Sequence, residues 1–390
     1  MVDDRFGVTA HEGLDLAEVE HALERLAGLH AEAGYAIVSP THLFRAELML
    51  DLYGEDIRGR AFLFPGGGGG EELCLRPDFT VPVVLAHAAQ GWDRQARYAY
   101  QGPVFRRQEP GSTRPVEYLQ AGIENLGAAD AATADSQVFS LTLKGIAEIG
   151  PEAIRVTTGD LGIPFALLEA LAMPARRRQR LRRHFWRPAR FRGLLDAAVR
   201  GPEAPSLRRA DLIAALGAPD PVAAVATHAA AAGEITGLRE LDELVSRAER
   251  LAGAEAEPPM PAEQAELIEA VTEVAGPSGE ALSQLRRLTA EAGADITAAL
   301  DRFEARLDAL NRSGVDAEDL SFDAAFGRNL EYYDGFVFEV LAEGRTDLPP
   351  LAGGGRFDAM TRQLGAAHAI PAVGAMIRPE AALLARRGAA

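Results

Sequence analysis

Two strand-like runs joined by a turn, at residues 102–127, constrain the fold of this chain more than any other segment. The polar positions of the alternating second run are Tyr118, Gln120, Gly122 and Glu124. Alternate residues of a strand share one face, and an aromatic ring, an amide, a glycine and a carboxylate suit a small-ligand pocket better than bulk solvent. We therefore expect an antiparallel hairpin with a pocket on one face, toward which Arg106 and Gln108 of the first run also point.

Composition limits the class of protein. The chain has 390 residues and 47% hydrophobic content, enough for a large core and two domains, and its mixed helix and strand signals indicate an α/β or α+β class. The net charge of −17 argues against a dedicated nucleic-acid binder, although it leaves a local basic patch open. A single cysteine, Cys74, excludes an internal disulfide and is expected to pack rather than react. Without a signal peptide or an apolar span, a cytoplasmic location is expected.

The amino-acid composition and the strand signals divide the chain into three parts. Strand signals concentrate in residues 1–172 and 314–390, which we interpret as one core. Residues 173–313 are rich in Ala, Leu, Arg and Glu, with few strand signals, and predict an inserted helical domain. The glycine run at 66–70 is interpreted as a hairpin tip, because no Lys-Ser/Thr pair follows to make a phosphate loop.

The stretch Arg176–Arg192 is the one basic concentration in this acidic chain. A solvated helix with Leu181, Phe185 and Trp186 turned inward is the favoured interpretation, and docking of RNA or of an acidic partner surface is the alternative. The eight histidines lack metal-ligand spacing, so no metal site is expected.

Five segments in order resemble the class II aminoacyl-tRNA synthetases, most closely the histidyl type. They are Ala33–Pro40, Leu75–Thr80, Phe105–Glu124, Arg328–Tyr333 and Gly354–Asp358. The resemblance covers residues 1–172 and 314–390, and the helical middle matches in position and texture only. It implies an antiparallel sheet flanked by helices.

The resemblance also implies a histidine-binding site. Its residues would be Asp78, Thr80, Arg106, Gln120, Glu124, Arg328, Tyr332 and Tyr333. In such a site Asp78 and Thr80 receive the ammonium group of the amino acid. Gln120 and Arg328 hold its carboxylate.

Glu124 and Tyr333 would bracket the imidazole, one accepting and one able to donate, which suits a ring with two distinct nitrogens. The structural alternative is an ion pair between Glu124 and Arg328, with Tyr332 and Tyr333 as core aromatics.

The residues that bind ATP in the synthetases are matched only in part in this sequence. Arg106 matches the arginine that contacts the α-phosphate of ATP in the synthetases. The departures are Gln108, Val116 and Ala381, the last standing where a cation is expected on the final helix. Arg378 lies nearby, but Pro379 alters the start of that helix. Loss of a cation that neutralises a triphosphate removes a large electrostatic contribution, so adenylation is expected to be lost.

The sequence ends at Ala390, without the anticodon-binding domain of a histidyl-tRNA synthetase. Chains of this kind resemble the regulatory subunits of ATP phosphoribosyltransferase in histidine biosynthesis. The resemblance implies a non-catalytic, cofactor-free homodimer that assembles with a short catalytic subunit, activates it and mediates feedback inhibition by histidine. The alternatives are a divergent histidine-activating ligase and a free-standing histidine-binding module. No membrane or nucleic-acid partner is expected.

Overall fold

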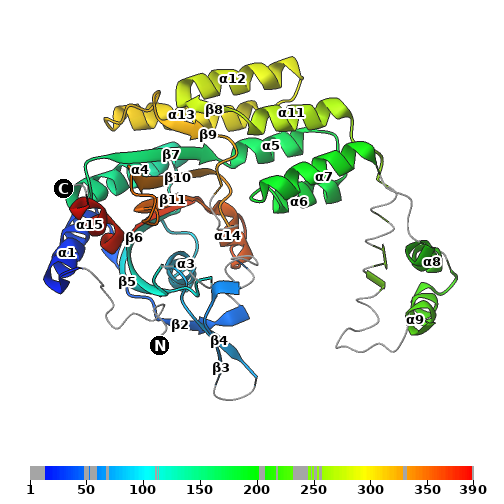
Figure 1. Ribbon diagram of the computed structural model, residues 1–390, viewed down its shortest axis with the longest axis horizontal. Helices are drawn as coiled ribbons and strands as arrows, with labels where there is room; N and C mark the ends of the chain where they lie inside the picture. The colour runs from blue at the N-terminus through cyan, green and yellow to red at the C-terminus, as the bar shows by residue number, and fades with distance from the viewer. Residues whose placement is uncertain are drawn as a thin grey trace. The chain divides into compact units, whose positions relative to one another are not determined.

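A nine-stranded sheet organises the larger part of the chain (Figure 1). In spatial order its strands are β1 (Ala36–Ile37), β5 (Ala96–Phe105), β6 (Glu117–Leu126), β12 (Ala372–Ile377), β11 (Ala352–Arg356), β10 (Phe336–Ala342), β7 (Ile154–Asp160), β9 (Ser321–Asp323) and β8 (Ala275–Pro277). The pairs β1–β5 and β7–β9 are parallel, and the other neighbours are antiparallel. The α+β class with an antiparallel sheet is confirmed.

This architecture is that of a computed structural model of the chain. It describes residues 14–47, 52, 59–66, 70–109, 112, 114–201, 207–216, 218–231, 245–246, 248–249, 253, 257–327 and 332–388.

Three helices cover one face of the sheet: α1 (Leu16–Glu32), α4 (Ala131–Ile149) and α15 (Pro379–Arg387). Asp15 caps α1 by accepting the N–H of Ala17, and Gly34, at φ +80°, follows its last turn. The apolar stripe of α1 is buried through Val19 and Leu26. The α4 helix contacts β6, β11 and β12, and α13 (Thr297–Arg312) packs on it.

The opposite face of the sheet carries the polar residues of β6. Glu124 pairs in register with Tyr98 of β5 and with Gly374 of β12, whereas Ile123 pairs with Ala99. The helix α3 (Thr80–Ala88) begins over this polar face, where Phe79 stacks on Tyr100 with the ring centroids 4.4 Å apart. A small sheet of β2 (Leu43–Arg45), β4 (Glu72–Leu75) and β3 (Leu63–Pro65) precedes α3.

The chain forms two compact units, residues 1–170 with 270–390 and residues 171–269. The second unit holds α6 (Ala175–Arg183) against α7 (Pro188–Arg200), and α8 (Leu207–Ala215) against α9 (Pro221–Ala231). The boundary between the units falls within α11 (Ala262–Thr272), and α5 (Gly162–Ala170) closes the first stretch of the larger unit.

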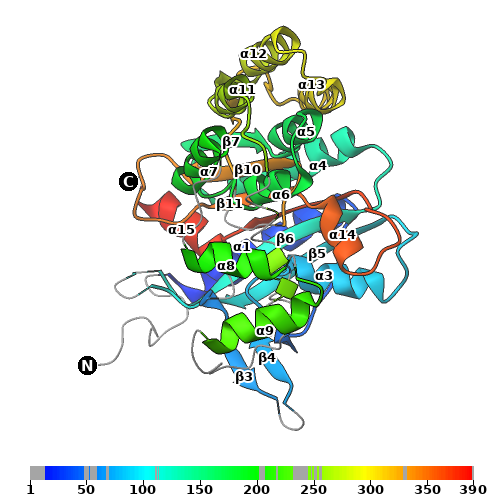
Figure 2. The same cartoon turned by 90° about the vertical axis from the view of Figure 1, so that its right-hand side faces the viewer.

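The helical unit ends at residue 269 in the structure, whereas the sequence suggests an end at residue 313. Residues 270–313, assigned to the helical insertion by their texture, pack with the sheet because β8 pairs with β9 and α13 contacts α4. The helix α12 (Ser278–Glu291) lies beside α13 in both views (Figures 1 and 2). Helical composition is therefore not a sufficient marker of the inserted unit.

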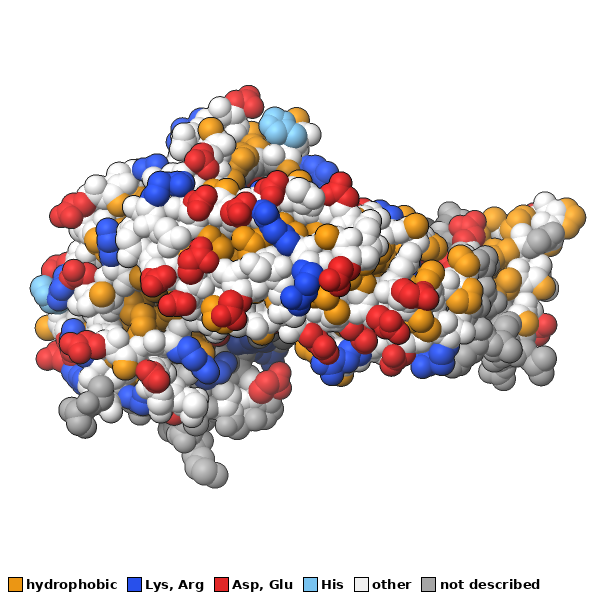
Figure 3. Space-filling model, turned by 90° about the horizontal axis from the view of Figure 1, so that it is seen from above, with side chains coloured by type: hydrophobic (Ala, Val, Ile, Leu, Met, Phe, Trp, Pro, Cys, Tyr) orange, Lys and Arg blue, Asp and Glu red, His pale blue; other side chains and the backbone are white. Residues whose placement is uncertain are grey.

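Acidic side chains, with Lys and Arg among them, are spread over the face drawn in Figure 3, in keeping with the net charge of −17. Among the helices that the structure describes, none combines the length and apolar character needed to cross a bilayer.

Candidate functional site

A nearly closed polar cavity lies on the pocket face of β5 and β6, with a volume of about 10 Å³. Its lining comprises Asp78, Thr80, Tyr100, Arg106, Gln120, Tyr332, Tyr333, Gly374, Ala375 and Met376. A cavity of this size has room for about one water molecule. Six side chains expected from the sequence thus line one cavity, although they come from segments more than 200 residues apart.

Glu124 lies at the inner end of this site and is fully buried. Its Oε1 accepts a hydrogen bond from Thr80 Oγ1 at 2.9 Å and a long one from Tyr100 at 3.5 Å, whereas Oε2 has no hydrogen-bond partner among the described residues. Burial raises the pKa of Glu124 well above its ordinary value, and Asp78 adds to the rise. Burial therefore favours the neutral form of this carboxyl group, and the hydrogen bond from Thr80 opposes that shift.

A hydrogen-bonded chain crosses the cavity. Tyr332 donates from its hydroxyl to Thr80 Oγ1 at 3.4 Å, and Thr80 in turn donates to Glu124. The Thr80 backbone N–H donates to Asp78 Oδ1 at 3.1 Å. The groups expected to receive an ammonium ion thus contact one another in the empty site.

Gln120 is 1% exposed, and neither Nε2 nor Oε1 of its amide has a hydrogen-bond partner among the described residues. Arg106 is also buried, and its Nε donates to the Pro77 carbonyl at 2.7 Å. Because buried amides are nearly always hydrogen-bonded, the Gln120 side chain, which lines the cavity, can bond to a polar ligand there.

Two glycines make room for these side chains. A Cβ on Gly122 would meet the Tyr100 hydroxyl, and a Cβ on Gly374 would overlap the Glu124 carboxyl group. Tyr100 and Gly374 were not expected from the sequence, since the strand pattern of β6 gives no information about the strands that flank it.

We expect Gly374→Ala to lower the free energy of unfolding by about 1–3 kcal/mol, because the new methyl group displaces the Glu124 carboxyl from its packed position. Urea denaturation measures the change. Gly28→Ala is the control, since a Cβ there, on α1, meets nothing within 4 Å. Equal stability of the two variants would contradict this description of the site.

Two arginine side chains lie beside the ring of Tyr118. The guanidinium carbons of Arg106 and Arg378 lie 5.9 Å and 5.7 Å from its ring centroid. Arg378 also donates from Nη1 to the Pro350 carbonyl. The aromatic face available for stacking a purine is thus in contact with the protein's own cations.

Gln108 is not among the residues that line the cavity. Its Nε2 donates to the Pro115 carbonyl at 2.9 Å, within the turn of the hairpin, so the expectation that it faces the pocket is wrong. Ala381 is buried within α15, at 6% exposure.

Arg328 lies outside the described residues, so its expected carboxylate contact and the alternative ion pair with Glu124 remain predictions. Tyr332 and Tyr333 line the cavity and also pack on Phe357, with ring centroids 5.9 Å and 6.5 Å away. They contribute to both the core and the pocket wall.

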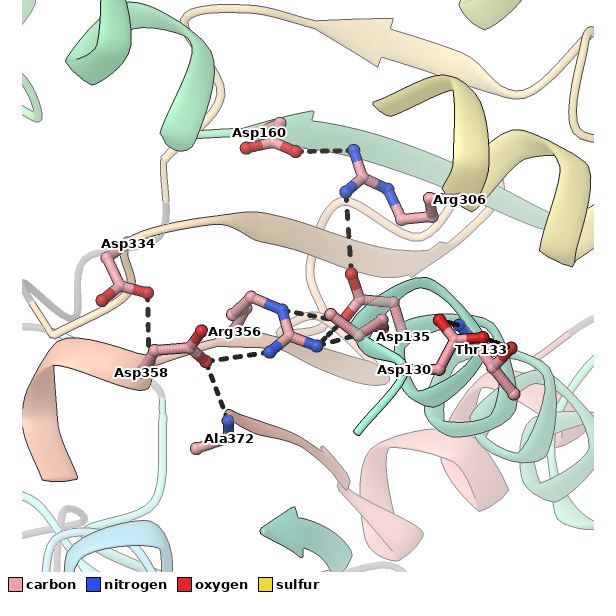
Figure 4. Close-up of polar contacts among 10 residues, drawn as sticks. Asp130, Thr133, Asp135, Asp160, Arg306, Asp334, Arg356, Asp358 and Ala372 are labelled. Carbon is pink, nitrogen blue, oxygen red and sulfur yellow. Dashed lines mark hydrogen bonds and ion pairs between the residues drawn. The ribbon is translucent and has the colours of Figure 1, made fainter. Parts of the chain in front are cut away.

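A network of buried charged side chains connects several elements of the larger unit (Figure 4). Arg356 donates to Asp135 at 2.7 Å and to Asp358 at 2.9 Å, and Arg306 pairs with Asp160 at 2.7 Å and with Asp135 at 3.6 Å. The network joins α4, β7, β11, α13 and the helix α14 (Asp358–Gln363). Burial opposes the charge on Arg356, but Asp135 and Asp358 together raise its pKa.

Asp334 connects this network to the pocket, because it directly follows Tyr333. Its carboxyl group accepts the N–H groups of Asp358 at 3.1 Å and Ala359 at 2.6 Å, at the start of α14. Burial, followed by the nearby Asp358 carboxylate, raises the pKa of Asp334 to about 7.

A carboxyl group whose pKa rises on folding stabilises the protein at low pH and loses that contribution as the pH passes its folded pKa. We therefore expect the free energy of unfolding to fall as the pH rises from about 4 through about 7. Asp334→Asn, which imitates the neutral acid, flattens this slope. Urea denaturation across the pH range measures both proteins, and an identical slope would contradict the assignment.

Cys74 is fully buried on β4, and burial raises the pKa of its thiol to about 11, so it packs rather than reacts. Among the described residues, no group of three or more His, Cys, Asp or Glu side chains is arranged to hold a metal ion.

Comparison with known proteins first gives the class. The sequence model of the histidyl-tRNA synthetase family matches residues 14–258 and 216–382. A Bacillus halodurans chain described as an ATP phosphoribosyltransferase regulatory subunit/histidyl-tRNA synthetase superposes with a TM-score of 0.68 at 19% identity, covering 99% of this chain and 83% of that one. A histidyl-tRNA synthetase from Nostoc sp. PCC 7120 superposes with a TM-score of 0.60 at 15% identity, covering 95% and 72%. The chain therefore has a histidyl-tRNA synthetase-like fold.

Sequence relatives identify the family within this class. The ATP phosphoribosyltransferase regulatory subunit of Brucella canis is 36% identical over 347 residues, which cover 84% of this chain and 87% of that protein, and that of Brucella melitensis biotype 1 matches to the same extent. The chain belongs to the family of ATP phosphoribosyltransferase regulatory subunits. It is therefore a regulatory rather than a catalytic chain.

Proposed function

We propose that this chain binds free histidine in the cavity and regulates a short catalytic ATP phosphoribosyltransferase subunit, which it activates and whose feedback inhibition by histidine it mediates. The observation that carries the proposal is the buried Gln120 amide without a partner among the described residues. Leaving such a group unsatisfied is unfavourable, so a polar ligand that bonds to it is favoured.

The chemistry of the other wall residues suits histidine. Asp78 offers a carboxylate to an ammonium group, and Glu124 Oε2 has no partner among the described residues. An imidazolium would form a charge-assisted hydrogen bond with an ionised Glu124, and a neutral imidazole would accept a hydrogen bond from the protonated acid. Tyr333 lies on the same cavity and supplies the second contact to the ring.

The small volume of the cavity suggests how histidine binding changes the conformation of neighbouring segments. A ligand the size of histidine cannot enter about 10 Å³ without breaking the contact between Tyr332 and Thr80. Movement of the tyrosine pair displaces Asp334, whose carboxyl group holds the start of α14. Histidine regulates the complex if the two arrangements of this segment bind it with different affinities.

The residues at the positions that bind ATP in the synthetases support a non-catalytic role. Ala381 replaces the cation expected for the triphosphate, and Tyr118 is already in contact with Arg106 and Arg378. Binding without turnover is what a sensor requires.

A homodimer of the sheet-bearing unit also belongs to this proposal. The strand β1 is an edge strand, and its Ile37 is 64% exposed. Exposed apolar side chains beside an open sheet edge favour coverage by a second copy. Sedimentation equilibrium is expected to give twice the chain mass of 41.5 kDa, and a monomer at micromolar concentration contradicts the dimer.

The function is tested by assaying the short catalytic subunit with and without this chain. We expect co-migration on size exclusion and a higher phosphoribosyltransferase rate with the chain present. Absence of both effects would overturn the proposal. Histidine-dependent exchange of pyrophosphate into ATP by the chain alone would instead support the ligase alternative.

A further inference from the structure

The helices α6 and α7 follow one another in the chain (Figure 1). Their sequence carries a concentration of positive charge that the proposed function does not use. Residues 175–200 hold ten arginines and one acidic residue, Asp196, in a chain whose net charge is −17. Such a local excess is unfavourable by itself, because like charges repel.

Four of these arginines gather at the turn between the two helices. We name Arg180, Arg183, Arg187 and Arg190 the arginine cluster. They are spaced by three, four and three residues, and all four side chains are exposed. His184 lies among them: burial lowers the pKa of its imidazole, and the charges of the four guanidinium groups lower it further.

A packed apolar face holds the cluster in place. Leu181, Phe185, Phe191 and Leu195 are buried, and the rings of Phe185 and Phe191 meet edge to face with centroids 5.5 Å apart. These contacts fix α6 against α7, so the backbone that carries the four exposed arginines is held in one arrangement.

The charges of the cluster are not neutralised within the part of the chain that the structure describes. Arg177, by contrast, is buried, pairs with Glu257 at 3.5 Å and donates to the Pro258 carbonyl. For the cluster residues, no ion pair with a described carboxylate is found.

We propose that the arginine cluster binds a compact polyphosphate, such as pyrophosphate or the triphosphate of a nucleotide. Guanidinium groups match phosphate oxygens with paired hydrogen bonds, and four of them complement the three or four charges of such an anion. A small anion is favoured over a nucleic acid. A long polyanion would extend beyond the four arginines, and the acidic remainder of the protein would repel it.

Calorimetric titration of the full chain with pyrophosphate and with ATP, at constant ionic strength, tests this site. We expect Arg183→Gln/Arg190→Gln to weaken binding by at least ~10-fold. The matched control is Arg192→Gln/Arg200→Gln, which makes the same charge change on α7 outside the arginine cluster, and it is expected to change binding less than ~3-fold. Tighter binding of ATP than of pyrophosphate identifies a nucleotide as the ligand, and equal binding identifies the diphosphate group itself.

Trp186 lies in the turn between the cluster residues, so its fluorescence localises the ligand. We expect a change on adding pyrophosphate that Trp186→Phe abolishes and Trp92→Phe retains. Absence of pyrophosphate binding, equal weakening in both arginine pairs, or equal competition by sulfate overturns the proposal. Tighter binding of duplex RNA than of either phosphate overturns it in favour of a nucleic-acid surface. Unchanged histidine affinity and melting temperature show that the variants are folded.

Discussion

Replacement of Arg356 by alanine is expected to lower the free energy of unfolding by about 3–5 kcal/mol, since it leaves buried carboxylates without their cation. Arg356 is 8% exposed and donates to both Asp135 and Asp358. Through these bonds it joins α4 to the start of α14. Urea denaturation monitored by far-UV circular dichroism measures the loss.

The control for Arg356 is Arg286→Ala. Arg286 pairs with Asp301 and Glu304 at the surface, and its side chain is 43% exposed, so its removal is expected to change stability little. A loss of the same small size in both variants would show that the buried network does not hold the sheet and helices together.

Glu124→Ala is expected to weaken histidine binding by about 100-fold, equivalent to the loss of one buried charge-assisted hydrogen bond of about 2–3 kcal/mol. Titration calorimetry of the isolated chain measures the affinity. Because burial raises the pKa of Glu124 and so favours its neutral form, Glu124→Gln is expected to fold, which separates lost binding from lost folding.

The matched control is Glu117→Ala, an exposed glutamate on the same strand as Glu124. It is expected to leave the histidine affinity unchanged. If the Glu117 and Glu124 variants bind histidine equally well, the carboxyl group of Glu124 does not contact the ligand.

The sequence predicts the local parts of this structure well. The alternation in β6 places Gln120 and Glu124 on one face, and the turn residues between β5 and β6 predict their antiparallel pairing. These features depend on neighbours within about ten residues, which a single sequence displays directly.

The parts of the structure that the sequence does not predict depend on contacts between residues far apart in the sequence. Gly374 faces Glu124 only through the register of β12 with β6, and a glycine in a strand has no pattern of its own. An aspartate such as Asp135 is usually exposed on a helix. Asp135 of α4 is buried, because Arg356, 221 residues later in the sequence, forms an ion pair with it. Likewise β8 and β9 are three residues long, too short for a periodic signal, so residues 270–313 were assigned to the wrong unit.

Control of a catalytic partner by the histidine pocket of this chain is tested by the phosphoribosyltransferase rate of the short catalytic subunit, assembled with the native chain or with Glu124→Ala, as histidine is added. We expect both chains to raise the rate and histidine to inhibit only the complex with the native chain. Equal inhibition of both complexes at the same histidine concentration would contradict the claim, because histidine would then act at another site.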